Sequence, residues 1–149
     1  RLARLLFHLE RYHISAPKLL AYGQRRNGWR IEAFVLHEQF PDRLQRMDQA
    51  LCEANAFRRD DLLQRLATVL ARLHDSGCEA HTLDCFAVRD EDEETSILIP
   101  DPQRLVFRRF LSPRRKAMDR HRVVRSMQSV CGYEELERFS RQYENESKR

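Results

Sequence analysis

A run of polar side chains between residues 78 and 84 holds the groups most able to do chemistry. The run carries two carboxylates, an imidazole and a hydroxyl, on Glu79, Asp84, His81 and Thr82. It follows a strongly patterned helix and precedes the apolar segment 85–88. Functional groups are often displayed on loops that rigid elements hold in place. We therefore expect a functional site in this run.

A lone aspartate, Asp101, follows the apolar strand expected over residues 95–99. A carboxylate at the end of a buried strand can bind magnesium through one or two oxygens and leave the other positions to water and phosphate. The acidic run 90–94 is expected to be a solvated hairpin tip, because consecutive acids on a turn repel one another and point apart. A zinc cluster on Cys78, His81 and Cys85 is not favoured, since their spacing matches no standard structural site.

The helix that leads into the polar run has apolar residues at positions 62, 63, 66, 69, 70 and 73. This spacing follows one stripe of a 3.6-residue period and predicts a core-facing helix. Asp60 is expected to cap its start, His74 to lie at the negative end of the helix dipole, and Ser76-Gly77 to end it.

The other patterns predict further helices and hairpins. Helices are expected over residues 2–12, 44–54, 113–130 and 133–143, and hairpins over residues 18–38, with Asn27-Gly28 as the turn, and 85–99. The sequence shows no regular βαβ alternation, so the expected fold class is α+β with segregated elements.

Length and composition indicate one domain. The 149 residues can bury a sizeable core, and 42% hydrophobic with 34% charged residues is typical of a globular protein. No apolar run approaches the roughly 20 residues that a membrane span requires. The four cysteines are widely spaced and suit a reducing compartment. Residues 1–6 already follow a helical pattern without a cap, so we expect the chain to begin inside the fold.

The formal charge of +4 comes mostly from arginine, which is suited to phosphate and carboxylate recognition. The most basic region contains Arg108, Arg109, Arg114, Arg115, Lys116, Arg120, Arg122 and Arg125. One interpretation is a surface that docks phosphorylated sugars or an anionic membrane, and an equal one is a solvated helix face. Nucleic acid is a weaker alternative, because the region lacks interleaved aromatic residues for stacking on bases.

Several segments, taken in order, resemble the bacterial lipopolysaccharide core kinase family, the Kdo/WaaP group, which has a protein-kinase-like fold. They are Ile14-Ser15-Ala16-Pro17, Leu19-Leu20-Ala21, and residues 34–41, 73–77, 99–105, 107–112, 116–119 and 138–143. Each segment alone is a weak match, and their shared order over nearly the whole chain carries the resemblance. It implies a partial N-lobe over residues 1–40 and a mostly helical C-lobe over residues 41–149.

The resemblance implies transfer of phosphate from ATP, with magnesium, to a sugar hydroxyl of the lipopolysaccharide core. Asp101 matches the family's metal-holding aspartate, the backbone of Glu38, Gln39 and Phe40 would meet adenine, and Asp119 would anchor the backbone of the catalytic loop. The implied partner is the lipopolysaccharide core or an inner-membrane glycolipid. The implied location is the cytoplasm, with peripheral contact at the inner face of the inner membrane.

The catalytic loop departs from the family pattern, because it is two residues shorter. Counting forward from Gly77 puts Thr82 at the position of the catalytic aspartate. Counting back from the strand puts Glu79 there and Asp84 at the metal-binding asparagine. The strand lysine and the glycine-rich loop are also absent from the sequence. Two hypotheses remain open: an active sugar kinase with a divergent loop, and a pseudokinase that serves as a binding or regulatory module.

Overall fold

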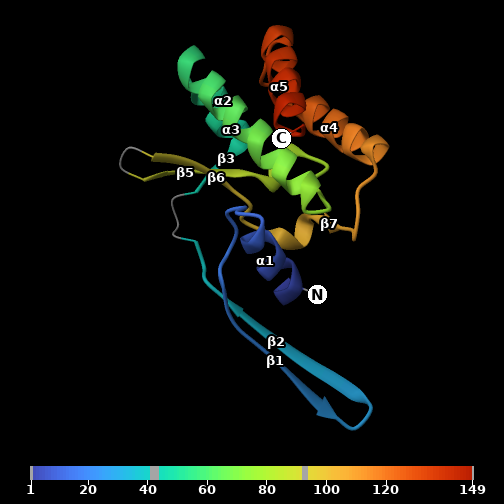
Figure 1. The fold of residues 1–149 in the computed structure, drawn as a ribbon. Helices are drawn as coiled ribbons and strands as arrows, with labels where there is room; N and C mark the ends of the chain where they lie inside the picture. Colours follow the sequence, from blue (N-terminus) through green and yellow to red (C-terminus); the bar gives the residue numbers. More distant parts are fainter. Residues whose placement is uncertain (1, 41–43, 92–93, 149) are drawn as a thin grey trace.

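The computed structural model describes residues 2–40, 44–91 and 94–148. In chain order its elements are α1 (Leu2–Arg11), β1 (Leu19–Asn27), β2 (Arg30–His37), β3 (Gln45–Arg46), α2 (Met47–Glu53), α3 (Ala56–Asp75), β4 (Cys78–Glu79), η1 (Leu83–Cys85), β5 (Ala87–Glu91), β6 (Glu94–Leu98), η2 (Pro102–Arg104), β7 (Val106–Phe107), α4 (Pro113–Met127) and α5 (Tyr133–Glu146). Helices α2 to α5 gather at one end, and the β1–β2 hairpin extends from the other (Figure 1). Among the described helices, none combines the length and apolar content that crossing a bilayer requires.

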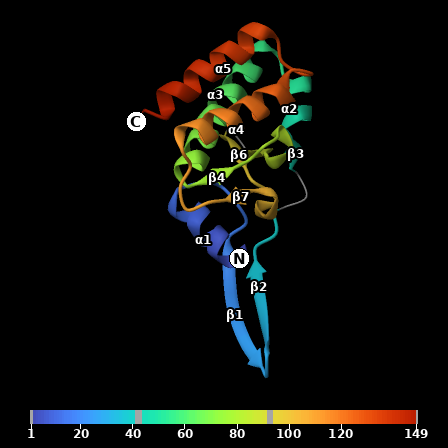
Figure 2. The ribbon, with the colours of Figure 1, turned by 90° about the vertical axis from the view of Figure 1, so that its right-hand side faces the viewer.

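Helix α3 is the centre of the core, as its apolar stripe predicts. Leu66 and Leu70 have no exposed surface, and Phe139 of α5 is buried with them in the same core. Fully burying a leucine or phenylalanine side chain contributes about 1.5–3 kcal/mol, so the stripe supplies much of the folding free energy. The two helices lie side by side, with α4 beside them (Figures 1 and 2).

The start of α3 differs from the sequence expectation. The helix begins at Ala56, and the side chain of Asn55 accepts a hydrogen bond from the Arg58 N–H at 2.9 Å. Asp60 lies inside the helix and accepts from Gln64 at 2.9 Å. The prediction of Asp60 as the cap is wrong because Asn is an equally good cap and the residues after Asn55 are compatible with a helix.

The polar run begins in β4, which pairs with β7 through Cys78 with Phe107 and Glu79 with Val106. Gly77 makes the turn from α3 into β4 with a φ of +83°, and a Cβ there would collide with the carbonyl of Arg108. Next to this pair, β3, β5 and β6 form an antiparallel sheet. The hairpin predicted over residues 85–99 is therefore present, and residues 92 and 93 of its expected acidic tip lie outside the described residues.

The predicted hairpin over residues 18–38 is also confirmed, with its turn one residue further along. Asn27 pairs with Arg30, so Gly28 and Trp29 form the two-residue turn, and Gly28 has a φ of +60°. This turn has glycine at its first central position, where a positive φ is required. Trp29 is 99% exposed at the tip.

Candidate active site

Asp119 of α4 holds the turn that follows β4. Its side chain is buried, one oxygen accepts the N–H of Ala80 at 2.8 Å, and the other accepts the N–H of His81 at 2.9 Å. His81 has a φ of +67°, a conformation that costs a non-glycine residue energy and that these two bonds help to maintain.

The start of α4, the helix that carries Asp119, agrees with the sequence prediction. Ser112 caps the helix by accepting a hydrogen bond from the Arg115 N–H, and Pro113 occupies the first turn.

A buried histidine connects Asp119 to α5. His74 Nε2 lies 3.0 Å from the Asp119 carboxylate, and Nδ1 lies 2.6 Å from the hydroxyl of Tyr143. Burial raises the pKa of Tyr143 to about 12, although the charge of Arg120 opposes it. With Nε2 protonated, His74 donates to Asp119 and accepts from Tyr143, so three helices fix the turn.

The pKa of Asp119 reflects this arrangement. Burial alone would raise it, but the hydrogen bond from His74 and the N–H groups of Ala80 and His81 outweigh burial and hold the pKa below its ordinary value. The carboxylate is therefore ionised at neutral pH, and its negative charge is stabilised by three donors.

His74 lies in the last turn of α3, as the sequence predicts. Its side chain has no exposed surface. Position 74 follows Leu70 by four residues and so lies on the buried stripe of α3. That spacing was the available signal for its burial, whereas its contact with Asp119, 45 residues away, has no local signal.

Glu79 lies between a histidine and two arginines. Its carboxylate is 3.0 Å from His81 Nε2 and 3.4 Å from both Arg108 and Arg115, and its side chain is only 5% exposed. Burial would raise the pKa of Glu79, but the bonds from His81 and Arg115 and the charge of Arg108 lower it overall. A carboxylate with a lowered pKa and three partners is a weak general base and a good structural anchor.

Thr82 is exposed and comes directly after the two residues that Asp119 holds. The next residue, Leu83, donates its N–H to Ser126 of α4 at 2.9 Å, so the loop runs along one side of that helix. Asp84 is also exposed. The loop therefore presents a hydroxyl and a carboxylate to solvent, while Glu79 stays inside.

Asp101 is connected to the loop through η2, the short helix that follows it. It is exposed and caps η2 by accepting from Gln103 N–H at 3.1 Å. Arg104 of η2 donates to the carbonyl of Asp84 at 3.0 Å, which joins the segment after Asp101 to the loop. The Asp84 carboxylate is 3.1 Å from Arg46.

Asp84 and Asp101 suit magnesium in the chemistry of their oxygens. Within residues 2–40, 44–91 and 94–148, no group of three or more His, Cys, Asp or Glu side chains is placed to hold a metal ion. Magnesium in nucleotide sites often takes only one or two carboxylates, with water and phosphates completing its coordination. These two exposed carboxylates fit a metal that arrives with a phosphate, and binding would require Asp84 to exchange its partners Arg46 and Arg104.

The predicted adenine-binding segment follows β2. The N–H of Glu38 donates to Lys18 O at 2.8 Å, and its carbonyl is 3.1 Å from the His37 ring. The Phe40 ring contacts Arg89, whose guanidinium lies 5.9 Å from the ring centre. The backbone of Gln39 and Phe40 makes no hydrogen bond to the rest of the described chain. Of the three residues, Gln39 and Phe40 therefore have the backbone N–H and C=O groups that are more available to a ligand.

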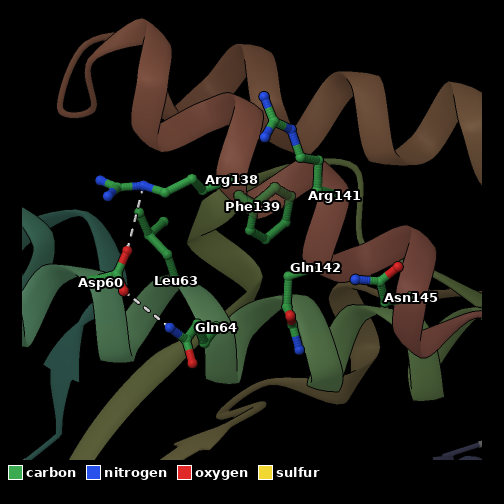
Figure 3. A pocket seen from close by; sticks show the side chains of 8 residues that line it. All are labelled: Asp60, Leu63, Gln64, Arg138, Phe139, Arg141, Gln142 and Asn145. Carbon is green, nitrogen blue, oxygen red and sulfur yellow. Dashed lines mark hydrogen bonds and ion pairs between the residues drawn. The ribbon is translucent and has the colours of Figure 1, made fainter.

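A groove between α3 and α5 lies apart from these residues (Figure 3). Asp60 bridges it, accepting from Gln64 at 2.9 Å and lying 3.5 Å from Arg138. Asp60 is 15 residues before the end of α3, so at 1.5 Å per residue it lies about 20 Å from that end of the helix. Most of the groove's polar side chains already have partners, and none of its lining residues belongs to the loop.

The chain has a helical body, short paired strands and a loop anchored by Asp119. The chain superposes with a TM-score of 0.76 on a solved structure described as WaaP in complex with acyl carrier protein. The match covers 95% of this chain and 64% of that one, at 16% sequence identity. The sequence matches no family model and no curated protein. The comparison shows a WaaP-like fold and confirms the predicted α+β, protein-kinase-like class.

Proposed function

We propose that this chain is a lipopolysaccharide-kinase-like module in which phosphate transfer is weak or lost. The observation that carries the proposal is the contact of Asp119 with the N–H groups of Ala80 and His81. If Asp119 anchors the catalytic loop as the resemblance implies, the residue after the anchored pair occupies the catalytic position. That residue is Thr82, which cannot accept a proton at neutral pH as a carboxylate does.

The competing assignment places Glu79 at the catalytic position and predicts an active kinase. Glu79 is buried, and its carboxylate is shared among His81, Arg108 and Arg115. These contacts favour a structural role, because a catalytic carboxylate must reach the hydroxyl of the acceptor.

Nucleotide binding is the part of the kinase function that the remaining residues support. Asp101 and Asp84 would hold magnesium, and the backbone of Gln39 and Phe40 would meet adenine. Bound magnesium would neutralise phosphate charge.

The division into a partial N-lobe over residues 1–40 and a C-lobe over residues 41–149 belongs to the same proposal. Residues 41–43, at this boundary, lie outside the described residues.

The proposed acceptor or partner is the lipopolysaccharide core or a related glycolipid, met at the inner face of the inner membrane. Support comes from the basic face of α4, because arginine suits phosphate groups and anionic lipids attract basic surfaces. Nucleic acid remains the weaker candidate, for which the described residues offer no aromatic platform on that helix.

The first experiment measures nucleotide binding in the full-length protein by a thermal-shift titration with ATP and magnesium or manganese. A dose-dependent rise in Tm that Asp101→Asn abolishes and Glu134→Gln retains supports the metal site. Glu134 is an exposed carboxylate on α5 and serves as the matched control. No shift in the unmodified protein would refute nucleotide binding.

The second experiment tests which residue of the loop, Thr82 or Glu79, occupies the catalytic position. Thr82→Asp restores a carboxylate to the proposed catalytic position, so we expect phosphate transfer to a lipopolysaccharide core acceptor to rise above that of the unmodified protein. The assay follows radiolabelled phosphate from ATP into the acceptor. Efficient transfer by the unmodified protein that Glu79→Gln abolishes would overturn the proposal in favour of the active kinase.

A further inference from the structure

A hollow of about 430 Å³ lies between the first turns of α4 and the turn after β4. It is lined by Glu79 and, on α4 and its cap, by Ser112, Arg114, Arg115, Met118 and Arg122. The volume falls within the range of sites that hold small molecules. The buried Asp119 also contributes to the wall, so the hollow adjoins the turn that Asp119 holds.

The arginines around this hollow differ in whether they have partners. Arg115 lies 3.4 Å from the Glu79 carboxylate, and Arg108 reaches the same carboxylate at 3.4 Å. Arg114 and Arg122 are exposed and make no hydrogen bond or ion pair with another described residue. Two exposed guanidinium groups that line one hollow without a paired carboxylate are available to an anion that enters it.

Other basic residues of α4 do have partners. Lys116 lies 2.6 Å from Asp75, and Arg120 lies 2.7 Å from Glu144. These two charges are neutralised where α4 meets α3 and α5, whereas Arg114 and Arg122 at the hollow have no carboxylate partner among the described residues.

The local charge balance indicates the charge of the ligand. Three guanidinium groups, on Arg114, Arg115 and Arg122, line the hollow together with the carboxylates of Glu79 and Asp119, and a fourth, on Arg108, reaches Glu79 from beside it. The carboxylates offset half of that charge, which leaves two positive charges for a ligand. A phosphomonoester carries close to two negative charges at neutral pH and accepts the paired N–H groups of arginine.

We propose that the hollow between α4 and the turn after β4 binds a phosphomonoester dianion, with Arg114 and Arg122 as its principal donors. Arg122 lies three residues after Asp119 and four before Ser126, so it shares the side of α4 along which residues 80–83 run. A ligand in the hollow therefore lies beside Glu79 and next to Asp119, which anchors the turn. This inference goes beyond the proposed function, because binding of the anion requires neither ATP nor phosphate transfer.

The phosphomonoester can belong to a soluble sugar phosphate or to a lipid headgroup, and the test separates these sources. Isothermal titration calorimetry measures glucose 6-phosphate binding to the full-length protein at pH 7.5, with glucose 6-sulfate and glucose as comparison ligands. Flotation measures binding to phosphatidylcholine vesicles that contain phosphatidic acid or, for comparison, phosphatidylglycerol. Phosphatidic acid presents a phosphomonoester and phosphatidylglycerol a phosphodiester.

We expect tighter binding of glucose 6-phosphate than of glucose 6-sulfate, because the sulfate ester carries one charge. Arg114→Gln and Arg122→Gln should each weaken binding about tenfold, as the loss of one charge-assisted hydrogen bond predicts. Arg125→Gln removes the same charge from an exposed position on α4 outside the hollow and should change binding less than twofold. Selective binding to phosphatidic acid vesicles, lost in the same two variants, would identify the lipid as the source.

Two results would overturn the proposal. One is an equal effect of Arg125→Gln and Arg122→Gln, which would mean that general surface charge attracts the anion. The other is binding of neither glucose 6-phosphate nor phosphatidic acid by a folded protein. Neither result depends on transfer activity, so the failure of this proposal is distinct from the failure of the kinase assignment.

Discussion

At the scale of single residues, the side chain with the most connections at the site is Asp119. It accepts from two backbone N–H groups and from His74 while fully enclosed. Burying a carboxylate costs several kcal/mol unless donors compensate for the lost water, and here three donors from two other parts of the chain do so. The conformation of residues 80–82 therefore depends on this one ionised group.

We expect Asp119→Asn to lower the free energy of unfolding by about 2–4 kcal/mol, because an amide cannot accept from both N–H groups and carries no charge for His74. Urea denaturation followed by circular dichroism measures the change. Asp84→Asn is the matched control, since Asp84 is 47% exposed and its ion pairs are at the surface. Its effect should stay below about 1 kcal/mol. A similar loss in both variants would contradict the anchoring role.

The lowered pKa of Asp119 also predicts a dependence on acid. A carboxyl group whose pKa is lower in the folded protein adds stability above its unfolded value, near 4, and that stability is lost as pH falls through the folded pKa. We therefore expect Tm to fall below about pH 4. The difference in Tm between the unmodified protein and Asp119→Asn should narrow as pH decreases from 6 to 3. A constant difference across this range would show that the Asp119 charge does not contribute.

At the scale of elements, the start of α3 can be tested by removing each possible cap. Asn55→Ala should cost about 1 kcal/mol, because the Arg58 N–H loses its acceptor. Asp60→Ala should cost less than about 0.5 kcal/mol, since its surface contacts with Gln64 and Arg138 are weak. Chemical denaturation of the two variants under the same conditions gives the comparison. If Asp60→Ala cost more stability than Asn55→Ala, the result would favour Asp60 as the cap, as the sequence predicts.

The elements were predictable where a pattern is local. The apolar stripe of α3, the Ser112-Pro113 start of α4 and both hairpins follow from nearby residues. The turn at Gly28 was displaced by one residue, because glycine at the first or the second central position suits different two-residue turns.

The site was predictable only in part. The polar run and its position after α3 were visible in the sequence, whereas the enclosure of Glu79 by Arg108 and Arg115 joins residues about 30 positions apart. The contact of Tyr143 with His74 spans 69 positions. Periodicity can tell that such residues are buried, but the partners of a buried polar group depend on how distant elements pack.

At the scale of the whole molecule, the helical body and the β1–β2 hairpin differ in how they are stabilised. The body encloses a continuous apolar core that includes α1 residues such as Leu9. The hairpin extends from this body (Figures 1 and 2). Both of its strands carry large apolar side chains that are exposed. An isolated two-stranded hairpin is marginally stable in water, so the hairpin adds little to the stability of the body.

This difference predicts the effect of replacing Tyr22, Ile31 and Leu36 with threonine. These side chains are 51%, 71% and 56% exposed, so the triple variant should keep the free energy of unfolding of the body within about 0.5 kcal/mol. Leu66→Ala, in the fully buried stripe of α3, should instead cost about 3–5 kcal/mol. Light scattering should show less self-association of the triple variant, because exposed apolar strands promote association. A loss above 1 kcal/mol in the triple variant would mean that the hairpin packs against the body in solution, which would contradict the separation of the two parts.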